Sequence, residues 1–276
     1  MAKVIVNILA GVVFVSVIST LSLAGVPLNN LEGVGGVAFN PLAYPANPGS
    51  SFGDPNNSFG KIFGKPQLGA WYVHLGDSKI DWTTFGVAET FFKRLEVSYG
   101  HEIIAIQGAD NIYKDNLGLK VLLLEEGNIL PALSIGTVFK HTSFDTADGV
   151  DNSGADFYLV ATKLIKNLHW PVLLSGGITS TKSRTLGVLG FDEDRDEIFF
   201  GNIDVLPFNN IAVGFEYRQG AEYDDWQDAD YWETHIAWFV NKNLTLVGAY
   251  VNAGDENSSS KVGLGDGVVF SIQYAF

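Results

Sequence analysis

The sequence predicts an all-β protein, a transmembrane antiparallel β-barrel of about twelve strands. Three observations support this prediction. The C-terminal segment alternates between large apolar and smaller or polar residues, and similar segments recur from residue 67 onward with short and long connections in turn. Apolar residues make up 46% of the chain and charged residues only 17%, against roughly 25% charged in an ordinary soluble domain. A wall with one lipid face and one interior face requires such a composition.

The N-terminal residues 1–24 predict a secretory signal peptide. Lys3 is the only charged side chain before Glu32, an apolar run follows it, and Ser22 and Ala24 place small residues just before a cleavage site. We expect cleavage after Ala24 and export of the mature chain. An uncleaved membrane anchor is the alternative, because the apolar run is long enough to span a bilayer.

Residues 25–66 do not share the hairpin pattern of the rest of the chain. They contain a glycine-rich stretch followed by a tract rich in Pro, Gly, Ser and Asn, which predicts an irregular segment. We expect it to lie inside or just beneath the barrel, because Gly33, Gly35 and Gly36 allow close backbone packing. A plug and a periplasmic arm both remain open. The barrel is then expected over residues 67–276.

From residue 67 onward, short turns alternate with longer connections. The short turns lie at residues 92–94, 126–128, 166–168, 208–210 and 241–243. The longer connections lie near residues 103–116, 142–154, 181–196, 219–230 and 252–266, and a shorter one on the same side lies at residues 76–79. The strands between them are expected near residues 68–75, 80–91, 95–102, 117–125, 130–140, 156–165, 170–180, 197–207, 211–218, 231–240, 244–251 and 267–276. The first strand then begins, and the last strand ends, on the side of the short turns. This arrangement is typical of barrels with short periplasmic turns and longer extracellular loops.

The last expected strand shows the alternation most clearly. Phe270, Ile272, Tyr274 and Phe276 are large and apolar, and the residues between them are smaller or more polar. Because successive side chains of a strand point to opposite faces, one face suits lipid and the other suits the interior. The segment resembles the C-terminal signal of bacterial outer-membrane proteins, which implies recognition of the strand ending in Phe276 by the barrel-assembly machinery.

The longer connections are expected to be acidic, and the chain has a net charge of −14. One acidic run spans residues 192–196 and another spans residues 222–230. An acidic outer rim would concentrate cations and repel anions, although ordinary loop solvation also explains such residues. The charge argues against nucleic acid as a partner, since phosphate binding needs a basic surface. Carboxylates at a spacing of two in residues 191–197 raise the hypothesis of a Ca²⁺ site.

Charged residues on the strands are expected to face the lumen, because Lys or Arg on the lipid face near the midplane costs about 2–4 kcal/mol. The lumen would be polar and either open or closed by pairing among these charges. The candidate lumen residues are Glu96, Lys120, Lys140, Lys163, Asp204, Glu216, Arg218, Glu233 and His235.

Aromatic residues near the expected strand ends predict two interfacial girdles, where amphipathic rings anchor at the headgroup level. They are Trp71, Tyr72, Trp82, Phe91, Phe92, Trp170, Phe208, Tyr231, Trp232 and Trp238.

No motif predicts catalytic residues, a cofactor or a metal-binding cluster. Gly33 begins a formal dinucleotide fingerprint, but no strand precedes it and no helix follows. The histidines lack ligand spacing. A Ser/His dyad assembled across strands would make the barrel a lipid hydrolase. Such a dyad would centre on His235, with Ser98, Ser134 or Ser271 as its partner.

The run LEGVGGVAFNPLAYPA at residues 31–46 carries a family resemblance, together with the export signal and the terminal Phe276. It resembles a domain-of-unknown-function family of exported Gram-negative proteins with the pattern LEGxGGxAxNPLAY. The resemblance implies a porin-like barrel in the cell outer membrane and supplies no functional residues.

The sequence therefore predicts an outer-membrane channel for passive diffusion of small cationic or neutral solutes, in contact with membrane lipid and lipopolysaccharide. Two alternatives remain open. One is a closed structural or adaptor barrel that docks an envelope partner, and the other is the lipid hydrolase. The oligomeric state is not predicted.

Overall fold

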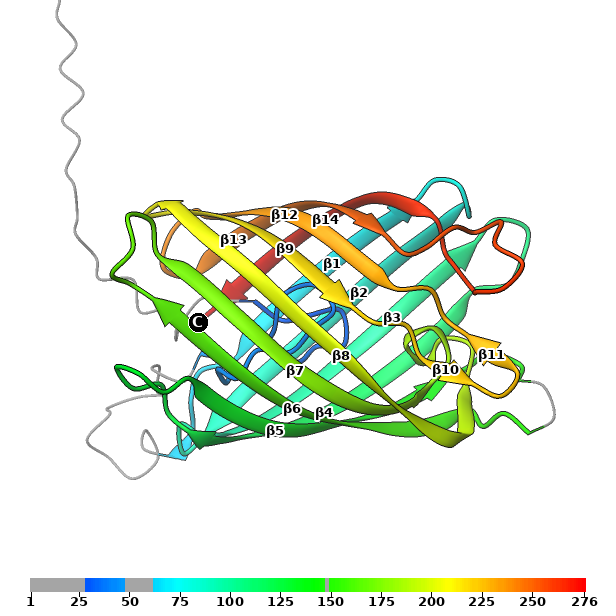
Figure 1. Cartoon of the computed structure of the whole chain (residues 1–276), viewed down its shortest axis with the longest axis horizontal. Coiled ribbons are helices and arrows are strands. Elements are labelled where there is room, and N and C mark those ends of the chain that lie inside the picture. Colours follow the sequence, from blue (N-terminus) through cyan, green and yellow to red (C-terminus); the bar gives the residue numbers. More distant parts are fainter. Residues whose placement is uncertain (1–27, 48–61, 147–148) are drawn as a thin grey trace, which may run out of the picture.

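The structure, a computed structural model, describes residues 28–47, 62–146 and 149–276. The expected signal peptide and its cleavage site lie outside these residues. The chain forms a closed barrel of twelve antiparallel strands (Figure 1), which confirms the predicted fold class. No helix among the described residues is long and apolar enough to cross a membrane.

The barrel strands follow the chain in order around the wall. They are β1 (Gln67–Leu75), β2 (Ile80–Phe91), β3 (Leu95–Ile106), β4 (Ile112–Leu124), β5 (Ala132–Thr142), β6 (Ser153–Ile165), β7 (Val172–Ser183), β8 (Phe191–Phe208), β9 (Ile211–Arg218), β12 (Tyr231–Phe239), β13 (Leu244–Asn252) and β14 (Asp266–Ala275). A small hairpin of β10 (Glu222–Tyr223) and β11 (Trp226–Gln227) lies between β9 and β12, and a 3-10 turn, η2 (Thr185–Gly187), lies between β7 and β8.

The barrel closes between its first and last strands. β1 pairs with β14 without a register shift, from Gln67 opposite Ala275 to Leu75 opposite Gly267. Closure leaves no strand edge, so the ladder satisfies the backbone polar groups that lipid could not. The alternation predicted for β14 is confirmed, since Phe270 and Ile272 are 59% and 53% exposed whereas Gln273 is 0% exposed.

Two of the expected outer loops are mostly strand. β3 runs to Ile106 and β4 begins at Ile112, so little of the expected loop 103–116 remains. β8 begins at Phe191, which places the acidic run 192–196 on a strand. Charge alone indicated a loop, but a strand that extends beyond the lipid can carry charged residues on its solvated part. The β10–β11 hairpin was not predicted.

The described part of residues 25–66 includes residues 28–47, which we call the N-terminal segment. It lies within the barrel, where Figure 1 draws it in dark blue, and nearly all of its side chains are buried. Leu31 and Phe39 join a large apolar cluster with Trp71, Trp82 and Val269 of the wall. The lumen was expected to be polar, but on this side it is not charged, because the inward faces of β1, β2, β13 and β14 carry no charged residue.

The expected aromatic girdles also need correction. Trp71, Trp82 and Tyr231 point inward and are at most 4% exposed, because their positions share the inward parity of their strands. Trp170 and Trp238 are exposed near the short turns, as expected.

Candidate functional site

The first feature of the interior is a buried ion pair that binds the N-terminal segment. Glu96 on β3 accepts hydrogen bonds from the backbone N–H of Gly35 at 2.9 Å and of Ala46 at 2.6 Å. Lys120 on β4 lies 2.9 Å from the same carboxylate and donates to the carbonyl oxygen of Gly35 at 2.8 Å. The pair therefore contacts both the donors and an acceptor of the segment's backbone.

Glu216 on β9 binds the segment from the opposite wall. Its carboxylate accepts hydrogen bonds of 3.1, 3.0 and 3.0 Å from the successive backbone N–H groups of Ala38, Phe39 and Asn40. Five strands separate β9 from β3 in either direction around the barrel. Glu96 and Glu216 thus hold the segment between opposite sides of the wall, through charge-assisted hydrogen bonds.

Hydroxyl and indole groups of the wall bind further backbone atoms of the segment. The N–H of Ala43 donates to Thr162 Oγ1 at 2.8 Å, and Ser134 Oγ donates to the carbonyl of Ala43 at 2.5 Å. Trp71 Nε1 donates to the carbonyl of Asn29 at 2.6 Å. Buried backbone N–H and C=O groups need hydrogen-bond partners. Here side chains of the wall supply the partners that a neighbouring strand would supply in a sheet.

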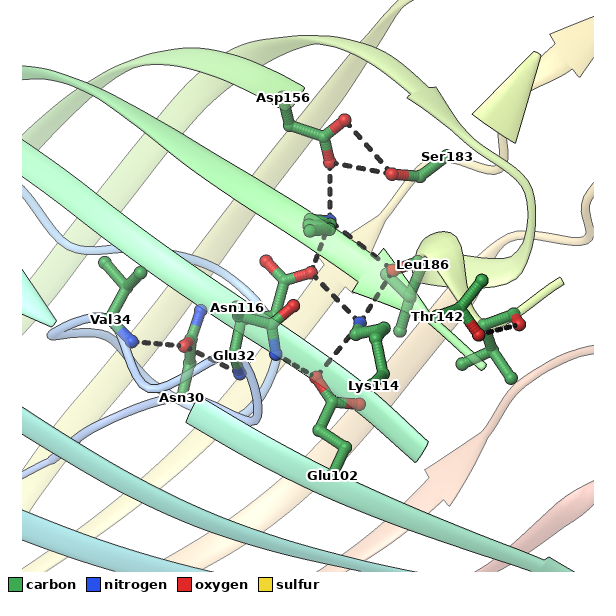
Figure 2. A network of polar contacts seen from close by, with 12 residues as sticks. Asn30, Glu32, Val34, Glu102, Lys114, Asn116, Thr142, Asp156, Ser183 and Leu186 are labelled. Atoms are coloured by element: carbon green, nitrogen blue, oxygen red, sulfur yellow. Dashed lines mark hydrogen bonds and ion pairs between the residues drawn. The ribbon is translucent and has the colours of Figure 1, made fainter. Parts of the chain in front are cut away.

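A second ion network joins the segment to β3, β4, β5 and β6 (Figure 2). Lys140 contacts both Glu32 of the segment and Asp156 of β6, the latter at 2.6 Å. Lys114 lies 3.0 Å from Glu102 and 3.6 Å from Glu32. Glu32 is therefore shared between two lysines, each of which also pairs with an acid of the wall.

The connection between β7 and β8 bends inward onto the same lysines. Nζ of Lys114 and of Lys140 donate to the carbonyl of Leu186 at 2.8 and 3.4 Å. Thr185 and Leu186 have φ angles of 49° and 59°, which non-glycine residues adopt only when surrounding contacts hold them. The two lysines thus contact the N-terminal segment and an outer connection at once.

Asp228 holds this inward connection from outside the spanning strands. It accepts hydrogen bonds from Thr185 N at 2.8 Å, from Thr185 Oγ1 at 3.0 Å and from Trp226 Nε1 at 2.8 Å. Burial raises the pKa of Asp228 to about 6. The carboxylate therefore remains mostly ionised at neutral pH and can accept all three bonds.

His235 lies between two acids. Its Nε2 is 2.7 Å from Asp204 and its Nδ1 is 2.6 Å from Glu233. With a carboxylate at each ring nitrogen, neither nitrogen is free to act as a base toward a serine. None of the three serines of the alternative dyad hypothesis, Ser98, Ser134 and Ser271, hydrogen-bonds His235, so the geometry does not assemble a Ser/His dyad there.

Eight of the nine candidate lumen residues point inward and are buried: Glu96, Lys120, Lys140, Asp204, Glu216, Arg218, Glu233 and His235. Lys163 does not. It shares the outward parity of Phe157 and Leu159, and its ammonium lies 3.1 Å from Glu126 at a short turn. Because β6 has apolar residues on both faces, the sequence pattern did not reveal its inward side.

Sequence reasoning missed Glu32, Glu102, Lys114 and Asp156. Glu102 lies an even number of residues after Glu96 on β3, and Lys114 an even number before Lys120 on β4, so both point inward. Extending the alternation through the expected loop would have identified both. No local pattern indicates Glu32, because its partners come from strands distant in the sequence.

The interior is filled at the level of the N-terminal segment. Three small cavities beside the segment measure about 50, 40 and 10 Å³, and one water needs at least about 10–15 Å³. A vestibule of about 980 Å³ opens at the short-turn end, lined in part by Lys93, Lys166 and Lys242. A solute entering this vestibule would meet the segment.

The contact with β3 depends on two glycines. Gly33 has a φ of 84°, and a Cβ on it would lie 2.6 Å from the carbonyl oxygen of Tyr99. A Cβ on Gly100 would lie 2.6 Å from the carbonyl oxygen of Glu32. The backbones of the segment and the wall therefore touch with no room for a side chain.

Replacing Gly100 by Ala should destabilise the folded barrel by about 1–3 kcal/mol, because the added methyl meets rigid backbone atoms. Gly248→Ala is the matched control, since a Cβ there meets nothing within 4 Å. Urea unfolding in lipid vesicles measures both variants. Equal stability of the two would contradict the close packing of the segment on β3.

The acidic run proposed for Ca²⁺ does not form a site in the structure. Within residues 28–47, 62–146 and 149–276, no group of three or more His, Asp or Glu side chains could hold a metal ion. Asp192 instead accepts a 3.0 Å hydrogen bond from Arg184 Nε.

Comparison with protein-family models matches residues 28–265 to one family, described as "Protein of unknown function (DUF3034)". A search of curated proteins finds no match to the chain. Among solved structures, the chain is similar to the KdgM porin, with a TM-score of 0.53 and 12% identity over 76% of this chain and 99% of that one.

Two other solved structures are similar at lower TM-scores. The NanC porin has a TM-score of 0.49 and 10% identity, over 76% of this chain and 98% of that one. Omp33 of Acinetobacter baumannii has a TM-score of 0.47 and 10% identity, over 78% of this chain and 100% of that one. At such identities the likeness to the KdgM porin shows the fold alone, that of an outer-membrane barrel.

Proposed function

Because the chain belongs to the DUF3034 family of proteins of unknown function and folds as a closed twelve-stranded barrel, we propose that it is a porin-like channel of the cell outer membrane whose own N-terminal segment closes it. Displacement of the segment would open a water-filled path for passive diffusion of small solutes. The observation that carries this proposal is the binding of the segment's backbone by Glu96 and Glu216 from opposite walls.

The outer surface supports a position in the membrane. Near the long connections, exposed tyrosines on the outward face each donate a hydroxyl hydrogen bond to an aspartate. Charged groups are costly at the lipid midplane, so these pairs indicate the headgroup level. The tyrosines are Tyr72, Tyr99, Tyr217 and Tyr250. Contact with membrane lipid and lipopolysaccharide follows from this position, and the exposed Phe276 supports recognition of β14 by the barrel-assembly machinery.

The segment's bonds are of a kind that water can replace. They run to side chains of the wall rather than along a continuous ladder, and a hydrogen bond to a charged group contributes about 1.5–3 kcal/mol net. Five such bonds to Glu96 and Glu216 favour the closed state by several kcal/mol without making it permanent. We therefore expect the unmodified channel to open rarely.

The charge of the outer end supports cationic or neutral solutes. Asp194, Asp196, Glu222 and Asp224 are near the long connections, and such a rim raises the local concentration of cations and lowers that of anions.

Single-channel recording of the refolded, signal-free protein in a planar bilayer tests the channel proposal. We expect rare, brief steps with a cation-selective reversal potential in a salt gradient. The filled interior also favours a second candidate, a closed adaptor barrel that docks an envelope partner. A folded, heat-modifiable barrel that never conducts, even after the contacts of Glu96 and Glu216 are removed, would support that candidate and overturn the channel.

A further inference from the structure

The wall side chains whose charges interact with Glu32 carry a surplus of one positive charge. They are three bases and two acids, all on inward faces: Lys114, Lys140, Arg218, Glu102 and Asp156. The segment adds Glu32, which makes the six-membered cluster formally neutral. Glu32 is thus the one carboxylate of the cluster that would leave with the segment.

Arg218 differs from the two lysines of the cluster because it forms no ion pair with the acids around it. Its side chain is 5% exposed, and it lines the cavity of about 10 Å³ that Glu32 and Asp156 also line. Its guanidinium makes none of the hydrogen bonds or ion pairs found among the described residues, and the carboxylates of Glu32, Asp156 and Asp228 interact with it only at longer range. A guanidinium can bind a carboxylate through two parallel hydrogen bonds. The present cavity is too small for a solute carboxylate, but departure of Glu32 would enlarge it and let Arg218 bind one.

Two acids, Glu216 and Glu233, lie on the neighbouring part of the wall. Glu216 on β9 lies opposite Glu233 on β12 in register, and Glu233 Oε2 has no hydrogen-bond partner in the described residues. In the closed barrel the segment gives Glu216 three N–H donors. When the segment leaves, Glu216 faces the lumen as an acceptor without those donors.

We infer that the cluster of Lys114, Lys140 and Arg218 is a carboxylate-binding site of the lumen, that Glu32 occupies it in the closed barrel, and that the channel admits small zwitterions. The solute's carboxylate would replace that of Glu32, and its ammonium group would replace the N–H donors at Glu216. A zwitterion carries no net charge, so the acidic outer rim does not repel it. This inference rests on the proposed channel function.

Chemical rescue tests the carboxylate site without requiring a channel. Glu32→Ala in the full chain removes the carboxylate and leaves a formal charge of +1 on the cluster. We expect a lower Tm than that of the unmodified protein, and recovery of Tm with formate or acetate but not with the same concentration of chloride. If the variant does not refold, the yield of refolding with and without formate is the readout.

Two variants control this experiment. Glu32→Ala combined with Arg218→Met leaves two bases and two acids, so it should not respond to formate. Glu125→Ala removes an acid from an exposed ion pair with Arg94 and should leave Tm unchanged. A Glu32→Ala protein that is as stable as the unmodified one, or that responds equally to formate and chloride, would overturn the carboxylate site.

Liposome swelling tests the solute class in Glu96→Gln, which weakens closure and keeps the cluster intact. We expect glycine to enter faster than glycerol, which has no charge, and faster than acetate, which is an anion. Entry of all three at rates set by size alone would overturn the zwitterion preference and leave the channel standing. No swelling with any solute, either in this variant or in the double variant with Glu216→Gln, would overturn the channel itself.

Discussion

Replacing Glu96 and Glu216 together by glutamine should turn a barrel that rarely conducts into one that conducts for most of the recording. Each amide keeps the shape of the carboxylate but loses its charge, and its NH₂ group cannot accept a backbone hydrogen bond. The remaining amide oxygen still accepts, so two or three of the five bonds are lost and the others lose their charge assistance. Because each charge-assisted bond contributes about 1.5–3 kcal/mol, and about 5.5 kcal/mol moves an equilibrium from 1:99 to 99:1, these losses are enough to invert the closed and open populations. The open fraction in single-channel records measures the change.

Glu125→Gln is the matched control for this double variant, because it makes the same chemical change in an exposed turn. Glu96→Gln and Glu216→Gln alone should give intermediate open fractions. Heat modifiability in gel electrophoresis establishes that each variant is folded. A folded double variant that stays as closed as the unmodified protein would show that these carboxylates do not hold the channel shut.

Lys140→Met should destabilise the barrel by about 3–5 kcal/mol, because it leaves buried acids without their shared counter-charge. Lys140 is 2% exposed and pairs with both Glu32 and Asp156. The methionine fills most of the space of the lysine stem, so the loss reflects charge rather than a cavity. Urea unfolding in lipid vesicles at neutral pH measures the effect.

Lys163→Met supplies the control on the neighbouring strand. Lys163 has the same side chain and an ion pair with Glu126, but its side chain is 21% exposed at the barrel rim. An ion pair accessible to water contributes about 0–1 kcal/mol, so this variant should lose little stability. Similar losses in the two variants would contradict the assignment of Lys140 to the interior network and Lys163 to the rim.

The barrel itself could be predicted because its alternation is local. In β9, Val213 and Phe215 face lipid while Gly214 and Glu216 face inward, as the period of two requires. The pattern fails where both faces are apolar, as in β6, and there the orientation of Lys163 was assigned wrongly. It also fails where a strand extends beyond the lipid, since polar residues on both faces at the start of β8 are typical of a loop.

The contacts that close the interior could not be predicted in the same way. Gly33, Gly35 and Gly36 indicate close backbone packing, and Gly33 does lie against β3. The choice of Glu96 and Glu216 as acceptors depends on two strands, β3 and β9, that face each other across the interior only when the barrel closes. Glu32 likewise has an ordinary sequence context, and its role depends on Lys114 and Lys140 of distant strands.

The interior of the barrel has an apolar face and a charged face, and the N-terminal segment contacts both. The apolar face formed by β1, β2, β13 and β14 packs against Leu31 and Phe39, whereas the charged face binds the segment's backbone and Glu32. Removing the segment would expose apolar surface to water on one side and release polar groups to water on the other. Opening therefore costs free energy on both sides, through exposed apolar surface on one and lost charge-assisted hydrogen bonds on the other, which is a reason to expect brief openings.

A reversible covalent lock on the N-terminal segment tests the central claim most directly. The chain has no cysteine, and the N–H of Ala43 lies 2.8 Å from Thr162 Oγ1, so Ala43→Cys with Thr162→Cys would place two thiols between the segment and β6. The measurement is single-channel conductance of this variant before and after reduction, with each single-cysteine variant as a control. We predict no openings while the disulfide is intact and openings on reduction. The same conductance in both states, with the disulfide verified by thiol counting, would contradict closure of the barrel by residues 28–47.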